Sequence, residues 1–148
     1  MKIIVANKRA NYDYTFTKKI DAGIVLTGSE VKSLRTNTGS LQGSYVLERN
    51  GELWLSNCNI KKYNKTNDVI YNPTRDRKLL VSKNDINKIL GLIKQNSMSM
   101  IPINLYFNNK GLAKLCFGIG KGKKKYDKRH VIKEKDWNIK KSRLLKSN

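Results

Sequence analysis

The chain has 148 residues, and 31 lysine and arginine residues against 11 aspartate and glutamate residues give a formal net charge of +20. Because self-repulsion at this charge opposes compaction, the surplus indicates an anionic partner. The length is that of one domain with a tail, and no apolar run approaches the about 18 residues of a transmembrane helix. The run Ile3–Ala6 is too short for a signal peptide, so we expect a cytoplasmic protein with no membrane partner.

The first predicted strand covers 18–27, where apolar and polar residues alternate. A short helix follows directly, with Val31 and Leu34 on its apolar face. Its polar face offers Lys32 and Arg35.

The next two strands are predicted as a hairpin. Leu41–Arg49 and Glu52–Cys58 flank Asn50-Gly51, which supplies the two positive φ angles of a type I′ turn. The segment Ile60–Arg77 fits no period. We expect a long surface loop there, covering part of the fold.

A short strand, a longer helix and a second hairpin follow. The strand is Lys78–Val81, and Ser82 with Asp85 resembles a capping box at the start of the helix. The helix continues with apolar residues at helical spacing, namely Ile86, Ile89, Leu90 and Ile93. Asn96 is expected just beyond its end. The second hairpin covers 98–119.

These elements predict a mainly β protein. Six short antiparallel strands with hairpin turns, one short helix and one longer helix are typical of a small barrel. An oligonucleotide-binding type of six-stranded antiparallel barrel is the natural candidate, although the pattern alone also allows a sandwich.

The composition changes at the glycine-rich run 118–122, which we interpret as a flexible exit from the last strand. No serine or threonine follows its lysine as a phosphate loop requires. Residues 1–120 carry a net charge of +11 and form the expected barrel domain, whereas the basic C-terminal tail 121–148 carries +9. The apolar residues of the tail form no single helical stripe, so we expect it to be disordered alone and to fold on a partner.

The residue inventory argues against catalysis. Cys58 and Cys116 are the only cysteines and lie far apart in strand-like contexts, which favours buried structural thiols over a disulfide framework or a zinc site. His130 is the only histidine and lies in a basic run, and the acidic residues show no paired spacing. We expect no enzyme activity, no catalytic residue, no metal and no cofactor.

Basic and aromatic residues point to RNA. The cations are expected near strand and helix ends that converge on one rim, at Asn7-Lys8-Arg9, Lys32, Arg35 and Lys121–Lys125. Aromatic faces that can stack on unpaired bases come from Tyr12, Tyr14, Tyr45, Tyr63, Tyr71 and Tyr126. Because no zinc finger and no four-stranded recognition motif is present, a structured RNA is the favoured partner.

Several runs of residues are specific to one family. They are Asn7-Lys8-Arg9-Ala10, the stretch Ala22–Arg35, Ser44-Tyr45-Val46, Asn72-Pro73-Thr74-Arg75, Arg77-Lys78-Leu79-Leu80, Leu105-Tyr106-Phe107, Lys121-Gly122-Lys123-Lys124, Asp127-Lys128-Arg129, Ile132-Lys133-Glu134 and Trp137. Over essentially its whole length the chain resembles the SsrA-binding (small protein B) family, the bacterial partners of transfer-messenger RNA.

The resemblance implies an oligonucleotide-binding barrel that binds the tRNA-like domain of transfer-messenger RNA and rescues stalled ribosomes by trans-translation. It implies that the barrel replaces the missing anticodon arm, and that the tail enters the mRNA channel near the small-subunit decoding centre and becomes helical there. Elongation factor Tu would be reached only indirectly, through the RNA. A ribosome-associated structural RNA-binding protein is the alternative.

The resemblance also implies roles for individual residues. Positions that match RNA binding are Asn7, Arg9, Glu30, Arg35, Lys114, Lys123 and Lys124, and Gly122 with Lys121 matches the junction before the tail. The charge and aromatic pattern adds Lys8, Tyr12 and Lys32 to the expected RNA-binding residues. The tail residues expected at the ribosome are Tyr126, Asp127, Lys128, Arg129, Ile132, Lys133, Trp137, Leu144 and Leu145. Tyr12 and Tyr126 stand where family members often carry histidine. Glu30 is expected either to orient a nearby cation or to accept a base amine.

Overall fold

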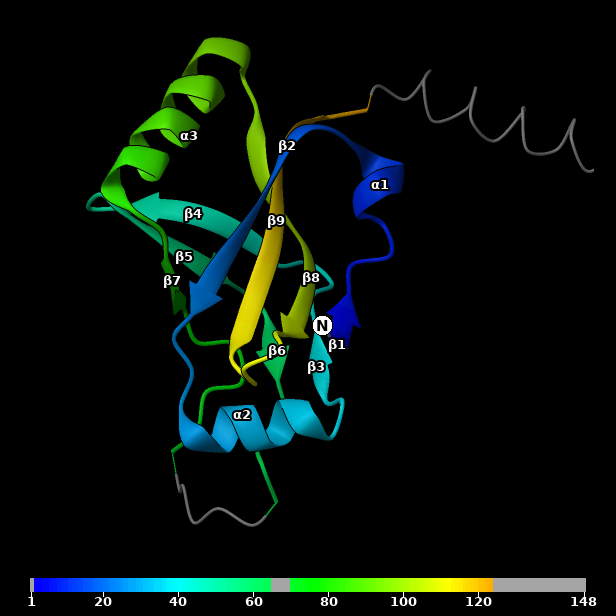
Figure 1. Ribbon diagram of the computed structural model, residues 1–148. Helices are drawn as coiled ribbons and strands as arrows, with labels where there is room; N and C mark the ends of the chain where they lie inside the picture. The colour runs from blue at the N-terminus through cyan, green and yellow to red at the C-terminus, as the bar shows by residue number, and fades with distance from the viewer. Residues whose placement is uncertain (1, 65–69, 124–148) are drawn as a thin grey trace, which may run out of the picture.

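The computed structural model describes residues 2–64 and 70–123. Seven antiparallel strands form one sheet in the order β1-β8-β9-β2-β7-β5-β4, and β3 pairs with β6 in a small second sheet (Figure 1). The elements, in chain order, are β1 (Lys2–Ala6), α1 (Ala10–Asp13), β2 (Tyr14–Ile24), α2 (Gly28–Arg35), β3 (Gly39–Ser40), β4 (Tyr45–Arg49), β5 (Glu52–Ser56), β6 (Asn59–Ile60), β7 (Arg77–Leu80), α3 (Lys83–Asn96), β8 (Ser99–Phe107) and β9 (Ala113–Gly122).

The sheet curls around one apolar core. β4, at one edge of the strand order, also lies against β8 near the other edge. The fully buried side chains that fill the space between them include Leu53, Leu55, Leu79, Leu105, Leu115, Phe117 and Ile119. The predicted mainly β antiparallel fold is confirmed. Its closure into a barrel stays a prediction, because the ladder of the described strands ends at β1 and β4 without pairing them.

Local signals place the helices. Thr27 and Glu30 form a full capping box at the start of α2. Ser82 accepts the amide hydrogen of Asp85 at 3.2 Å, as predicted for the start of α3. Asn96 is still helical, and the left-handed residue that ends α3 is Ser97, with φ 51°. The predicted helix end was therefore early by one residue.

The turn between β4 and β5 is also determined by its own residues. Asn50 and Gly51 have φ angles of 54° and 78°, which confirms the predicted hairpin between β4 and β5. The glycine-rich run predicted as a flexible exit is instead part of β9, which pairs with β2 as far as Gly122. A Cβ on Gly120 would lie 2.3 Å from the carbonyl oxygen of Thr15, so a glycine there lets the two strands approach closely.

The two cysteines, both predicted as buried thiols, differ in burial. Cys58 is buried and free, and burial raises the pKa of its thiol to about 11. Cys116 is free and partly buried, and burial also raises its pKa. Among the described residues, no helix is both long and apolar enough to cross a bilayer.

Candidate nucleic-acid interface

One group of predicted residues gathers around α1, where β1 ends. The side-chain amide of Asn7 donates to the carbonyl of Pro102 at 2.9 Å, which anchors the segment between β1 and α1. Arg9 lies over the ring of Tyr12, 5.0 Å from its centroid, and pairs with Asp13 at 3.4 Å. The Arg9 side chain is still 70% exposed. The exposed guanidinium thus lies over the ring of the partly buried Tyr12.

The end of β9 joins the same group. Lys123 donates its backbone N–H to the carbonyl of Asp13 and its Nζ to the carbonyl of Asn11, both at 2.7 Å. Lys121 is exposed and pairs with Thr15 in the ladder with β2. We call this group the α1 end, and its members are Asn7, Lys8, Arg9, Tyr12, Lys121, Gly122 and Lys123.

A second group lies at the other end of the strands. Lys32 and Arg35 are exposed on α2, and the Arg35 guanidinium lies 5.8 Å from the centroid of the Phe107 ring. Lys114 is half-buried at the start of β9, where it pairs in the ladders with Gly23 and Tyr106. We call Lys32, Arg35 and Lys114 the α2 end.

The expectation that residues 7–9, Lys32, Arg35 and the start of the run 121–125 converge on one rim was wrong, because α1 and α2 lie at opposite ends of the long strands. Lys114 and Lys121 lie near opposite ends of β9. At about 3.3 Å per residue their Cα atoms are roughly 23 Å apart. Figure 1 shows the same separation, with α1 at one end of the long strands and α2 across the other. The candidate interface is therefore two basic groups held apart by a rigid sheet.

The structure places Glu30 inside the protein, with no exposed surface. Its Oε2 accepts from the Nε of Arg77 at 2.7 Å and from the Nε of Arg75 at 3.1 Å. Its Oε1 accepts the backbone N–H of Thr27 at 2.9 Å and a second bond from Arg75. Because both oxygens are occupied by these donors, the geometry favours the cation-orienting role over a base contact.

The surroundings of Glu30 favour its ionised form. Burial opposes ionisation of Glu30, but hydrogen bonds from Arg75 and Thr27 and the charge of Arg77 hold its pKa below the ordinary value. Arg77 is fully buried and also donates to the carbonyls of Cys58 at 2.7 Å and Pro73 at 3.0 Å. The cluster therefore fixes α2 to β7, to the segment just before β7 and to the connection between β5 and β6.

Arg75 and Arg77 are the residues that sequence reasoning missed as parts of the site. They were assigned to the surface loop Ile60–Arg77, whose two end residues are in fact fully buried. One signal in the sequence could have found them. Glu30 is the one acid of the segment 28–35, and a carboxylate that becomes buried requires cationic partners, which here come from outside that helix. The guanidinium of Arg75 is the part of the cluster that reaches the surface, since its side chain is 34% exposed.

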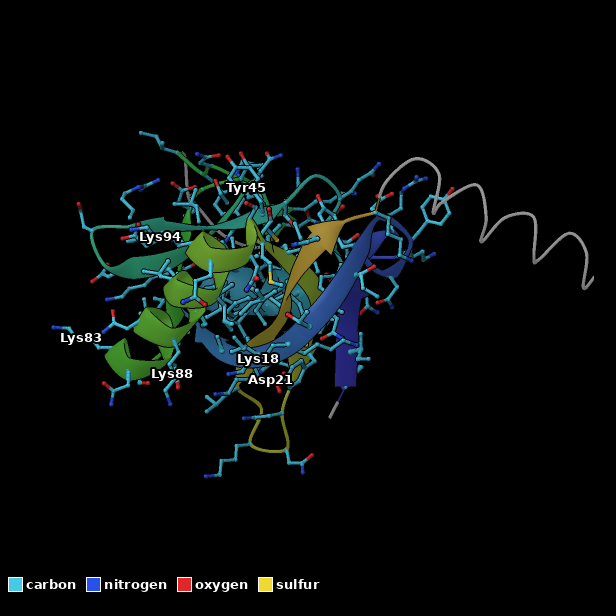
Figure 2. All side chains as sticks on the ribbon, turned by 90° about the horizontal axis from the view of Figure 1, so that it is seen from above. Lys18, Asp21, Tyr45, Lys83, Lys88 and Lys94 are labelled. Carbon is cyan, nitrogen blue, oxygen red and sulfur yellow. The ribbon has the colours of Figure 1, made fainter. Side chains whose placement is uncertain are left out.

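A third basic surface was not predicted at all. Lys83, Lys88 and Lys94 point outward from α3, on the side of the molecule away from α1, and Lys18 lies on β2 (Figure 2). Asp85 in the first turn of α3 and Asp21 on β2 reduce its net charge.

The predicted stacking tyrosines have different surroundings. The hydroxyl of Tyr71 donates to the carbonyl of Ile60 at 2.6 Å, Tyr14 stacks on Phe16, and Tyr45 is 46% exposed on β4. Lys124 and every tail residue from Tyr126 to Leu145 assigned above lie outside the described residues, as does His130. Within the described ranges, no group of three histidine, cysteine or acidic side chains is placed to hold a metal ion.

Comparison with known proteins gives one consistent result. The family described as "SmpB protein" matches residues 4–147. The chain is 50% identical over 148 residues to an SsrA-binding protein of Ehrlichia canis, with all of both chains covered. It is 45% identical to one of Wolbachia pipientis from Culex pipiens, covering 100% of this chain and 99% of the relative.

A solved structure agrees with these relatives. It is described as "tmRNA-SmpB: a journey to the center of the bacterial ribosome", and one of its chains is 39% identical, with a TM-score of 0.67. The match covers 81% of this chain and 84% of that one.

Proposed function

Because this chain belongs to the SmpB protein family, we propose that it binds transfer-messenger RNA and delivers it to stalled ribosomes in trans-translation. The observation that carries the proposal is the match across nearly the whole chain. The protein acts by binding and catalyses no reaction. We place this activity in the cytoplasm, where bacterial ribosomes translate.

The two basic groups support binding to a folded RNA. Arg9 at the α1 end and Arg35 at the α2 end offer planar guanidinium groups to phosphates, whereas the exposed lysines act as point charges. Their separation suits two backbone segments of one RNA fold, such as the tRNA-like domain of transfer-messenger RNA. Each contact of this kind adds affinity that falls with salt.

Glu30 supports this interface without touching the RNA. Its carboxylate holds Arg75 by two bonds, and the same guanidinium donates to the carbonyls of Asp76 and Val25 at 3.3 and 3.4 Å, while the side chain stays 34% exposed. Glu30 therefore acts as a positioning residue, and Arg75 is added to the proposed RNA-binding residues.

The tail is proposed to make the contacts with the ribosome. Residues 124–148 lie outside the described part of the chain, and their high positive charge suits an rRNA-lined channel. We assign Asp127-Lys128-Arg129 to the decoding centre and Leu144-Leu145 to a late step of tagging, with elongation factor Tu contacted only through the RNA.

A competition gel shift tests the proposed function. Labelled transfer-messenger RNA is titrated with the full chain, and elongator tRNA is the competitor. The proposal expects transfer-messenger RNA to be preferred by at least tenfold, about 1.4 kcal/mol. Equal affinity for both RNAs would instead favour a general ribosome-associated RNA-binding protein.

A further inference from the structure

Helix α1 is a single turn, Ala10–Asp13, which follows Arg9 and contains Tyr12. A helix this short is not stable by itself in water, because nucleating the first turn costs more than its few hydrogen bonds return. The buried residue of the turn is Ala10, whose side chain is one methyl group and contributes little apolar burial. The position of Arg9 and Tyr12 therefore depends on contacts that hold this turn from elsewhere in the chain.

The start of α1 is anchored to β8 by Asn7. This residue donates its backbone N–H to the carbonyl of Ile103 at 2.7 Å and its side-chain amide to that of Pro102 at 2.9 Å. Its own carbonyl accepts the N–H of Ala10 at 3.1 Å. Asn7 thus fixes where α1 begins, and the other end of the turn requires an anchor of its own.

The end of α1 presents carbonyl groups that need donors. The last four carbonyls of a helix have no partner within it, and in a turn of four residues this applies to all of them. The carbonyl of Ala10 accepts the N–H of Tyr14. The carbonyls of Asn11 and Asp13 both accept from Lys123, the first from its Nζ and the second from its backbone N–H, each at 2.7 Å. The residue that follows β9 therefore provides donors for two of these carbonyls.

The charge of Lys123 also suits this end of the helix. Aligned carbonyl dipoles make the C-terminus of a helix partly negative, and a lysine that bonds to the last carbonyls is favourable there. Lys123 is partly buried against the turn, whereas its neighbour Lys121 on β9 is exposed. The two lysines thus have different surroundings, which points to different roles.

We infer that Lys123 is a positioning residue: it holds the end of α1 in place and affects RNA binding through that turn, not by contacting a phosphate. The inference rests on the proposed function and deepens it, because it separates a residue that shapes the RNA-binding surface from the residues that touch the RNA. The resemblance implies an RNA-binding role for Lys123. The bonds to Asn11 and Asp13 give that role a different cause, since without them Arg9 and Tyr12 lose their fixed position.

The salt dependence of RNA binding distinguishes positioning from a phosphate contact, because each contact contributes roughly 0.7–0.9 to the slope of log affinity against log salt. Lys123→Met removes the charge and the side-chain donor but keeps the backbone bond. We expect it to weaken binding to transfer-messenger RNA by about two- to tenfold, the effect of one lost hydrogen bond, with an unchanged slope. The control Lys121→Met, at an exposed position of β9, should flatten the slope by about one unit. A flattened slope or an unchanged affinity for Lys123→Met would overturn the inference.

Hydrogen exchange of the free chain tests the anchoring of α1 without RNA. The N–H of Asp13 is bonded to the carbonyl one turn before it at 2.9 Å, so it exchanges when α1 opens. Lys123→Met should speed this exchange by about two- to tenfold, and Lys121→Met should leave it unchanged. The N–H of Met98, bonded at the end of α3 at 3.2 Å, should exchange alike in all variants. Equal exchange of Asp13 in the wild type and in Lys123→Met would overturn the inference.

A conservative variant separates the positioning of α1 from a general loss of stability. Lys123→Arg keeps a long cationic donor for a carbonyl, so it should restore both the protection of Asp13 and the RNA affinity to the wild-type values. Failure to restore the protection of Asp13, while Met98 exchanges as in the wild type, would contradict the inference. If the wild type binds no transfer-messenger RNA at all, the proposed function fails, and the exchange of Asp13 alone then decides whether Lys123 holds α1.

Discussion

Replacing Glu30 by glutamine removes the negative charge of the buried cluster while keeping the length of the side chain. Arg77 then stays fully buried and keeps its carbonyl acceptors on Cys58, Pro73 and Arg75, but it loses its carboxylate partner. Arg75 is partly exposed and can be hydrated. Removing one partner of a buried ion pair costs about 3–5 kcal/mol. Since glutamine retains one acceptor oxygen, we expect a loss near the lower limit, about 3 kcal/mol.

Urea unfolding measures this loss. With a slope of about 1–3 kcal/mol per molar urea, the midpoint should fall by at least about 1 M. Glu52→Gln is the matched control, because Glu52 forms a surface pair with Lys78 at 3.1 Å in which both side chains are more than 40% exposed. Such exposed pairs contribute about 0–1 kcal/mol. A midpoint shift for Glu30→Gln no larger than that of the control would refute the reasoning.

The pH dependence gives a second readout of the same cluster. The folded-state pKa of Glu30 lies below its ordinary value of 4.5, so the unfolded chain binds more protons in this range. The contribution of Glu30 is therefore fully present above about pH 4.5 and is lost as the pH falls through the folded-state pKa. The wild type should lose more stability than Glu30→Gln on acidification from pH 6 to pH 3. Parallel losses would contradict the cause assigned to the shift.

Three further predictions concern the sheet, the α2 end and the tail. Gly120→Ala should destabilise the fold by about 1–3 kcal/mol, because its Cβ would lie 2.3 Å from the Thr15 carbonyl oxygen. The control Gly91→Ala, in open space on α3, should instead stabilise the fold by about 0.5–1 kcal/mol. Equal effects of the two variants on thermal unfolding would contradict the close packing of β9 against β2. Arg35→Ala should flatten the log–log salt dependence of RNA binding by about one unit, whereas an unchanged slope would mean that Arg35 meets no phosphate. Deleting 127–148 should leave RNA affinity nearly intact and abolish peptide tagging in a reconstituted translation assay; a collapse in affinity would contradict the proposed separation of roles.

Elements with strong local signals could be predicted from sequence. The Asn50-Gly51 turn and the Ser82 cap depend on a few neighbouring residues, so their geometry follows from local chemistry alone. The mainly β class followed from these turns and from the alternation of the strands between them. The start of β2 was missed because a bulge between Phe16 and Lys18 shifts its register and interrupts the alternation.

The site was less predictable because it depends on contacts between distant segments. Glu30 meets Arg75 and Arg77 across more than forty positions of sequence, and no local pattern encodes that meeting. The extended conformation of β9 also separates two of the predicted RNA-binding cations. Lys114 and Lys121 are near in sequence, but they lie near opposite ends of this strand. Residue types indicated which groups could bind RNA, and only the topology determined which of them lie together.

The bonds from Lys123 to the carbonyls of Asp13 and Asn11 hold Lys123 at the α1 end. They fix the origin from which the remaining 25 residues depart. From that origin, the last residue lies within about 38 Å if all 25 are helical, at 1.5 Å per residue, and within about 80–90 Å if they are extended. Under the proposed function, RNA bound at the α1 end would set the position of Lys123, and these two lengths would limit how far from that RNA the last residue can contact a ribosome.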